Sequence, residues 1–267
     1  SGITTVTLTI TEASTSCVAT ASNTINIYQT PTASFTTNAP QCTNTPINFH
    51  NTGSTGGNWT YDWDFGPNAT PSVSSSQNPS GILYDSSGTR LVTFTIADAN
   101  CAATITDSIK INNTPFASFT STAPECSGLP VGFTNTGTTT GVTWTWNLGA
   151  GANPSASIVQ NPTGVVYSTA GINSVTLTIT DSATSCFTSV TNTINIYQTP
   201  TASFTSTAPQ CANAPINFTN TGSTGNNWTY AWDFGQNAAP ALSSSENADG
   251  VVYNSSGNKT VTFTISD

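Results

Sequence analysis

The sequence has little charge and few residues of the kinds that carry out chemistry. Only 6% of its 267 residues are charged, it has a single histidine, and it has no methionine. Three basic residues against twelve acidic ones give a net charge of −9. Such a chain has almost nothing to neutralise phosphates, which argues against nucleic-acid binding. It also has no apolar run of the roughly eighteen residues that a membrane-spanning helix needs, so we expect no membrane insertion.

The same scarcity argues against an enzyme. One histidine and scattered acids form no Ser/His/Asp, Cys/His or paired-carboxylate arrangement, so we expect no catalytic residues. The single histidine, His50, stands where the equivalent positions hold Thr134 and Thr219. We interpret it as a solvent-facing residue on the outward side of a strand.

What the sequence does have is internal repetition. Cys42, Cys126 and Cys211 are spaced 84 and 85 residues apart, and residues 24–35 recur almost unchanged at 193–204. We call 31–114, 115–199 and 200–267 repeats 1, 2 and 3. We predict that repeats 1 and 2 are whole modules and that repeat 3 is a module truncated before its last strand. Residues 1–30 are expected to be the C-terminal part of a preceding module.

Each repeat contains a stretch in which aromatic and polar residues alternate. Strict alternation predicts a half-buried β-strand, and its apolar face is expected to form the core. The alternative, a platform on which sugars stack, is less favoured by this period. Three tyrosines before a later turn are expected to place their rings in the core and their hydroxyls on the turn. The predicted core residues are Trp59, Tyr61, Trp63, Phe65, Trp144, Trp146, Leu148, Trp228, Tyr230, Trp232, Phe234, Tyr84, Tyr167 and Tyr253.

The spacing of strand and turn signals predicts an immunoglobulin-like sandwich in each repeat. The predicted fold class is therefore all-β, with tandem β-sandwiches in a linear array. In repeat 1 the expected strands are 33–36, 47–51, 59–65, a weak strand within 66–79, and then 81–84, 91–96 and 103–111.

A set of motifs in repeat 1 resembles the polycystic-kidney-disease (PKD) domain family. They are Trp63-Asp-Phe-Gly66, Asn78-Pro79, Tyr84, Gly88 and Val92-Thr-Phe-Thr-Ile96, and related residues occur in repeats 2 and 3. The chain departs from the family pattern because the second Asp-Gly and the histidine before the tyrosine are absent, and repeat 3 has Asn247-Ala248. Together with the cysteine placement, the repeats look like those of very large surface proteins of gliding Bacteroidetes. That resemblance implies type IX secretion and a filament or adhesin.

Asp64, Asn147 and Asp233 occupy one position that follows the central tryptophan. A calcium site is one interpretation, because Ca²⁺ takes several oxygen ligands. We favour the other, in which the side chain accepts hydrogen bonds from turn N–H groups. Asp64 and Asp233 are therefore only weak metal candidates, and no cofactor is expected.

Six cysteines in two periodic series predict disulfides and an oxidising location. In an immunoglobulin-like topology Cys42 and Cys101 lie in loops at opposite ends of one sandwich, beyond the reach of a disulfide. We therefore predict Cys42–Cys186 across the junction of repeats 1 and 2. Pairing within one repeat and pairing between chains remain open. The remaining four would pair outside this segment: Cys17, Cys101, Cys126 and Cys211.

These observations predict a structural repeat segment of a secreted cell-surface filament or adhesin, located outside the cell. Strand faces rich in Thr, Ser and Asn are nearly neutral, so copies can pack side by side without charge repulsion. The expected partners are copies of the chain in a homo-oligomeric filament, with glycans or another cell's surface as further candidates. The alternative function is a carbohydrate-binding module of a secreted polysaccharide-degrading protein.

Overall fold

The computed structural model describes residues 2–267, and every regular element in this range is a β-strand. The chain falls into two compact units. One holds the chain up to Phe119 with Asn135–Thr145 and Leu177–Val190, and the other holds Thr120–Thr134, Trp146–Thr176 and Thr191–Asp267. This division runs through repeat 2, whose strands belong to both units.

The first two strands form a hairpin of their own. β1 (Gly2–Thr11) pairs antiparallel with β2 (Val18–Ile27), from Gly2 opposite Ile27 to Thr11 opposite Val18. Every residue of both strands is exposed, and no other strand in the described part of the chain pairs with either.

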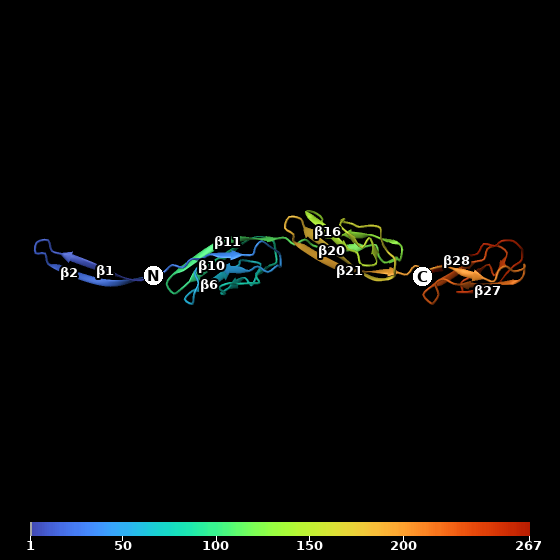
Figure 1. The fold of residues 1–267 in the computed structure, drawn as a ribbon, viewed down its shortest axis with the longest axis horizontal. Coiled ribbons are helices and arrows are strands. Elements are labelled where there is room, and N and C mark those ends of the chain that lie inside the picture. The colour runs from blue at the N-terminus through green and yellow to red at the C-terminus, as the bar shows by residue number, and fades with distance from the viewer. Residues whose placement is uncertain (1) are drawn as a thin grey trace. The chain divides into compact units, whose positions relative to one another are not determined.

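Repeat 1 forms a sandwich of two layers. The larger layer is a five-stranded sheet in the order β4-β11-β10-β6-β8, and Figure 1 shows β10 between β6 and β11. The pairs β3–β5 and β7–β9, linked by the bridge between Ile47 and Ile82, form the other layer. The strands are β3 (Phe35–Thr37), β4 (Gln41–Cys42), β5 (Phe49–Asn51), β6 (Thr60–Asp64), β7 (Ala69–Thr70), β8 (Val73–Ser74), β9 (Leu83–Tyr84), β10 (Gly88–Ala97) and β11 (Ala102–Asn112).

In two places of repeat 1 the chain crosses from one layer to the other between two short strands. The strand expected at 33–36 corresponds to β3, which pairs antiparallel with β5, whereas β4 was not expected and pairs parallel with β11. The weak strand expected within 66–79 becomes β7 and β8, again in different layers. Pro40 and Pro71 stand at these divisions. A proline has no N–H to donate, so it ends one ladder and lets the chain cross to the other sheet.

Repeats 2 and 3 show related sheets. Repeat 2 has a five-stranded sheet in the order β13-β21-β20-β16-β18, with β12–β15 and β14-β19-β17 beside it, and repeat 3 has β22-β23-β27-β25 and β26-β24-β28. The strands of repeat 2 are β12 (Phe119–Ser121), β13 (Glu125–Cys126), β14 (Pro130–Val131), β15 (Phe133–Asn135), β16 (Val142–Asn147), β17 (Ala152–Asn153), β18 (Ala156–Ser157), β19 (Val165–Tyr167), β20 (Gly171–Asp181) and β21 (Phe187–Tyr197). Those of repeat 3 are β22 (Phe204–Ser206), β23 (Pro215–Asn220), β24 (Thr229–Asp233), β25 (Ala238–Ala239), β26 (Leu242–Ser243), β27 (Ala248–Tyr253) and β28 (Thr262–Ser266).

A tryptophan lies at the centre of each core. Trp63 stacks on Phe94 with ring centroids 3.8 Å apart, and Trp232 stacks on Phe263 at the same distance. Their predicted core neighbours are also buried: Phe65, Trp146, Leu148, Phe234, Tyr84, Tyr167 and Tyr253. The alternation therefore placed these side chains on the correct face.

The aromatic residues at the start of the same strands differ from the prediction, because they are only half-buried. They are Trp59, Tyr61, Trp144, Trp228 and Tyr230. Trp59 and Tyr61 pack against the edge of the repeat 1 core. The opposing strands β3 and β5 have three residues each, too few to cover the whole apolar face of β6, so one end of that face is left partly open. With two packed layers and these crossovers, the fold is all-β, with tandem immunoglobulin-like sandwiches.

Candidate functional site

One covalent bond links repeat 1 to repeat 2. Cys42, in β4, is joined to Cys186, which directly precedes β21, and their Cα atoms are 5.7 Å apart. The two cysteines are 144 residues apart in the sequence and belong to the same compact unit. This is the pair named from the sequence, so the structure contains a disulfide between successive repeats.

Local hydrogen bonds fix both ends of this disulfide. At one end Cys42 lies opposite Asn112 in the parallel pairing of β4 with β11. At the other end the Asp181 N–H donates to the Cys186 carbonyl over 2.7 Å. The Asp181 carboxylate accepts hydrogen bonds from the hydroxyl and N–H of Thr184, both at 2.8 Å, and these bonds hold the pKa of that carboxyl below its usual value. Cys186 is completely buried.

The other four cysteines are not bonded to one another or to any described residue: Cys17, Cys101, Cys126 and Cys211. Two of them repeat the local geometry of the bonded pair. Cys126 lies opposite Tyr197 in the parallel pairing of β13 with β21, as Cys42 does in β4. The Cys101 carbonyl accepts the Asp98 N–H over 2.9 Å, as Cys186 does from Asp181. Their pairing with cysteines outside the segment stays a prediction.

The weak calcium candidates are engaged in turns. Asp64 Oδ1 accepts the N–H of Gly66 over 2.8 Å, and Asp233 Oδ1 accepts that of Gly235 over 2.8 Å. Asn147 does the same in repeat 2. Within residues 2–267 no group of three or more His, Cys, Asp or Glu side chains is placed to hold a metal ion. These side chains therefore act as the turn acceptors that the sequence analysis favoured.

The three buried tyrosines each tie down the end of the central strand. Their hydroxyls donate to the carbonyls of Phe65, Leu148 and Phe234 over 2.9, 2.7 and 2.9 Å. Burial raises the pKa of Tyr84 and of Tyr167 to about 12, and it also raises the pKa of Tyr253. These groups are neutral donors with a structural role, since an ionised phenol would lose the hydrogen bond.

A buried asparagine in each repeat was not identified from the sequence. In repeat 1 Asn51 donates from Nδ2 to the Ser54 carbonyl and accepts the Gly53 N–H at Oδ1, at 3.0 and 2.9 Å. Its own N–H donates to Asn78 Oδ1 over 2.9 Å. Asn220 and Asn247 repeat this arrangement, although no proline follows Asn247. The recurring Asn-Thr-Gly at 51–53, 135–137 and 220–222 was the available signal.

The outward face of the long hairpin in repeats 1 and 2 carries a ladder of hydroxyl groups. Thr93 pairs with Thr106 and Thr95 with Thr104, with oxygen atoms 3.0 and 2.9 Å apart. In repeat 2 the corresponding pairs are Thr176–Thr191 and Thr178–Ser189. In repeat 1 charged side chains flank this ladder, because Asp64 and Asp62 of β6 lie opposite Thr93 and Thr95. No helix long and apolar enough to cross a bilayer occurs between residues 2 and 267.

Comparisons with protein-family models and with curated proteins find no match. Among solved structures the chain is similar to an I-band fragment from titin, at 10% identity and a TM-score of 0.39, covering 86% of this chain and 90% of that one. It is also similar to extracellular domains 3–5 of Drosophila OTK (12% identity, TM-score 0.31, covering 85% and 89%). Three N-terminal domains of the bacteriophage RB49 Highly Immunogenic Outer Capsid protein match at 11% identity and a TM-score of 0.30, covering 87% and 91%. Likenesses at these values say nothing of function.

Proposed function

We propose that the chain is a structural repeat segment of a secreted cell-surface filament or adhesin, and that its role is mechanical. The disulfide between Cys42 and Cys186 carries this proposal, because it joins two successive repeats. A disulfide within one repeat would strengthen only that sandwich. A covalent link between neighbours limits bending at the junction and resists separation under load. Such bonds persist in oxidising surroundings, which supports an extracellular location.

Repeats 1 and 2, at 31–114 and 115–199, are proposed to be PKD-like modules. Repeat 3, at 200–267, is proposed to be a truncated PKD-like module, and residues 1–30 the C-terminal part of a preceding one. Residues of the family pattern have clear structural roles in repeat 1, which supports this assignment. Asn78 accepts the N–H of buried Asn51, and Tyr84 donates to the Phe65 carbonyl. By the same resemblance we propose a large surface protein of the kind exported by type IX secretion in gliding Bacteroidetes. The hydroxyl ladders support lateral self-association of copies.

Surface labelling tests this function. An antibody raised against the purified chain should label intact cells that produce the protein, and immunogold should lie along extracellular threads. Labelling that requires permeabilised cells would overturn the proposal.

A glycan array tests the alternative, carbohydrate binding. The half-buried Trp228 and Tyr230 are the aromatic residues from which a sugar platform would be built. We expect no glycan bound by the wild-type chain. Binding that is lost in Trp228→Ala but kept in a Tyr28→Ala control, where the exposed ring directly follows β2, would instead establish the carbohydrate-binding function.

A further inference from the structure

The layer of repeat 1 that contains β3 and β5 has an open groove on its outward side. The groove has a volume of about 450 Å³, and Thr36, Asn48, His50, Asn78 and Ser80 are among the residues that line it. None of the described residues that line it is acidic, and His50 is the only one of them that titrates. A negatively charged group that enters the groove therefore meets no like charge on its walls, although the whole chain has a net charge of −9.

The hydrogen bonds behind the groove leave its amide groups as donors. Asn48 Oδ1 accepts the Gly81 N–H over 3.0 Å, and Asn78 Oδ1 accepts the Asn51 N–H over 2.9 Å. Because a backbone N–H can only donate, these bonds fix the oxygen of each amide and leave its NH2 group for a ligand. His50 adds a ring N–H on the same face of its strand as Asn48. Such a set of donors suits a carboxylate, which only accepts hydrogen bonds when it is ionised.

The outward face of the other layer of repeat 1 displays carboxylates. Asp62 and Asp64 are exposed in β6 on either side of the buried Trp63. They are two residues apart, which is about 6.6 Å along a strand, and Asn48 and His50 are separated by the same step. Two such faces placed against each other would bring four carboxylates together and repel. The face therefore needs a surface of donors as its partner, and the groove on the opposite side of the sandwich is one.

Repeat 1 alone combines the donors and the carboxylates at these positions. The corresponding residues of the other repeats cannot be charged: Thr134 and Thr219 for His50, and Thr145 and Ala231 for Asp62. Repeat 3 also has Asp249 where repeat 1 has Ser80, which places a negative charge beside its amides. A contact between the two faces is therefore specific to repeat 1, and it would align neighbouring copies with repeat 1 beside repeat 1.

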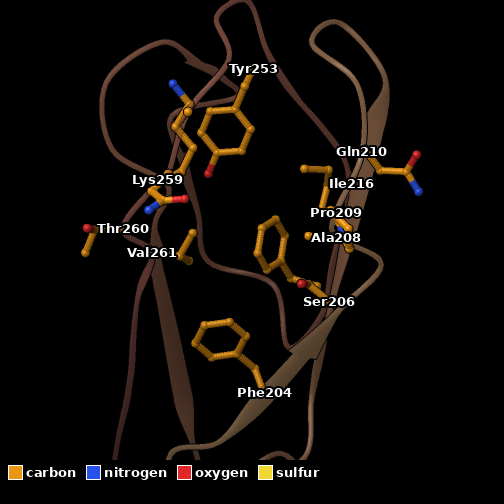
Figure 2. Close-up of a pocket in the computed structure, with 13 residues that line it drawn as sticks. Phe204, Ser206, Ala208, Pro209, Gln210, Ile216, Tyr253, Lys259, Thr260 and Val261 are labelled. Atoms are coloured by element: carbon orange, nitrogen blue, oxygen red, sulfur yellow. The ribbon is translucent and has the colours of Figure 1, made fainter.

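The pocket of about 630 Å³ in repeat 3 is of another kind. Figure 2 shows Phe204 at one end of this pocket, and Ile216 and Val261 on its opposite sides. Its one charged lining residue, Lys259, donates to Ser255 Oγ over 2.9 Å. This pocket presents hydrocarbon side chains where the repeat 1 groove presents amide and imidazole groups, so it does not offer the same site.

We propose that the groove of repeat 1 binds the Asp62 and Asp64 carboxylates of a second copy of the chain, with Asn48, His50 and Asn78 as donors. The groove and the carboxylates lie on opposite faces of one sandwich, so each copy binds one neighbour on either side. The contact is therefore heterologous and extends sideways into a row of copies. This inference rests on the self-association in the proposed function and names its contact. It does not depend on the surface location, so the labelling experiment and the experiments below fail separately.

Sedimentation of the full chain over a range of concentrations tests the contact. We expect oligomers that grow with concentration, and more so at about pH 6 than at about pH 8, because a protonated imidazole adds a positive charge that the carboxylates attract. His50→Thr introduces the residue that repeats 2 and 3 have at this position. It should weaken association about tenfold and remove most of the pH dependence.

Two matched substitutions show whether the groove itself is the site of contact. Ser80→Asp places a carboxylate on the groove wall and should weaken association at least about tenfold. Ser87→Asp adds the same charge at an exposed position between β9 and β10 and should change association little. Equal effects of the two, a His50→Thr variant that associates as the wild type does, or a chain that stays monomeric at every concentration would overturn the proposal.

An exchange of charge between the two faces tests whether they meet each other. His50→Asp alone should weaken association, because both faces are then negative. Adding Asp62→Lys and Asp64→Lys to the same chain should restore association, since the groove and the opposite face again differ in sign. The control adds Asp85→Lys and Asp107→Lys to His50→Asp, which gives the same net charge at exposed positions outside both surfaces, and it should stay weak. Restoration by both pairs of lysines, or by neither, contradicts the proposal.

Discussion

The Cys42–Cys186 disulfide should change how the chain bears a pulling force. When the two ends are pulled, tension that reaches Cys42 passes through the bond to Cys186, and the chain between them carries no load. The bond spans 144 positions. An extended chain covers roughly 3.3–3.6 Å per residue, so the bond should withhold about 500 Å of extension.

Single-molecule force spectroscopy on chains held by their termini measures this directly. The oxidised chain should extend by the length of the segments outside the bond, and the double variant Cys42→Ser, Cys186→Ser should extend by about 500 Å more. Adding a reductant to the wild type should give the same increase. The variant Cys126→Ser is the control, because Cys126 is not bonded to any described residue, and it should behave as the oxidised wild type.

The same bond should stabilise the folded state. Closing a loop of this length contributes about 5 kcal/mol in the chain-entropy description of the unfolded state. Denaturant unfolding of the double variant should therefore show a lower free energy of unfolding by an amount of that order.

The pulling experiment can refute the mechanical reasoning. If oxidised and reduced chains extend by the same length, the bond does not lie in the load path and the reasoning is wrong.

Two further substitutions test the packing within the repeats. Tyr167→Phe removes the hydrogen bond to the buried Leu148 carbonyl and should lower the free energy of unfolding by about 1–3 kcal/mol in urea titrations. Because burial raises the Tyr167 pKa to about 12, the wild type should lose this contribution as pH rises from 10 to 12, and the variant should lose less. Gly53→Ala would place a Cβ 2.0 Å from the Thr32 carbonyl oxygen and should lower the melting temperature through a loss of about 1–3 kcal/mol, whereas Gly57→Ala, with open space around it, should change it little. Equal effects of the two glycine substitutions, or an alkaline profile unchanged by Tyr167→Phe, would contradict these assignments.

The local pattern of the sequence was enough to determine the fold class and much of the core. Alternation alone placed Trp63, Phe65 and Trp146 on the buried face, because a strand presents every second side chain to the same layer. Repetition was enough to show that three related units follow one another. The cysteine periodicity predicted disulfides. The bond was expected between repeats because Cys42 and Cys101 lie in loops at opposite ends of one sandwich.

Only the tertiary structure decided how far each core extends and where strands change partners. The sequence cannot show that β3 and β5 are too short to cover Trp59, because burial depends on the opposing layer and not on the strand itself. The sequence likewise gives Ile25 and Ile194 identical neighbours along the chain. One is exposed and the other is buried, because burial is a property of what packs against a strand, and two identical segments differ in that alone.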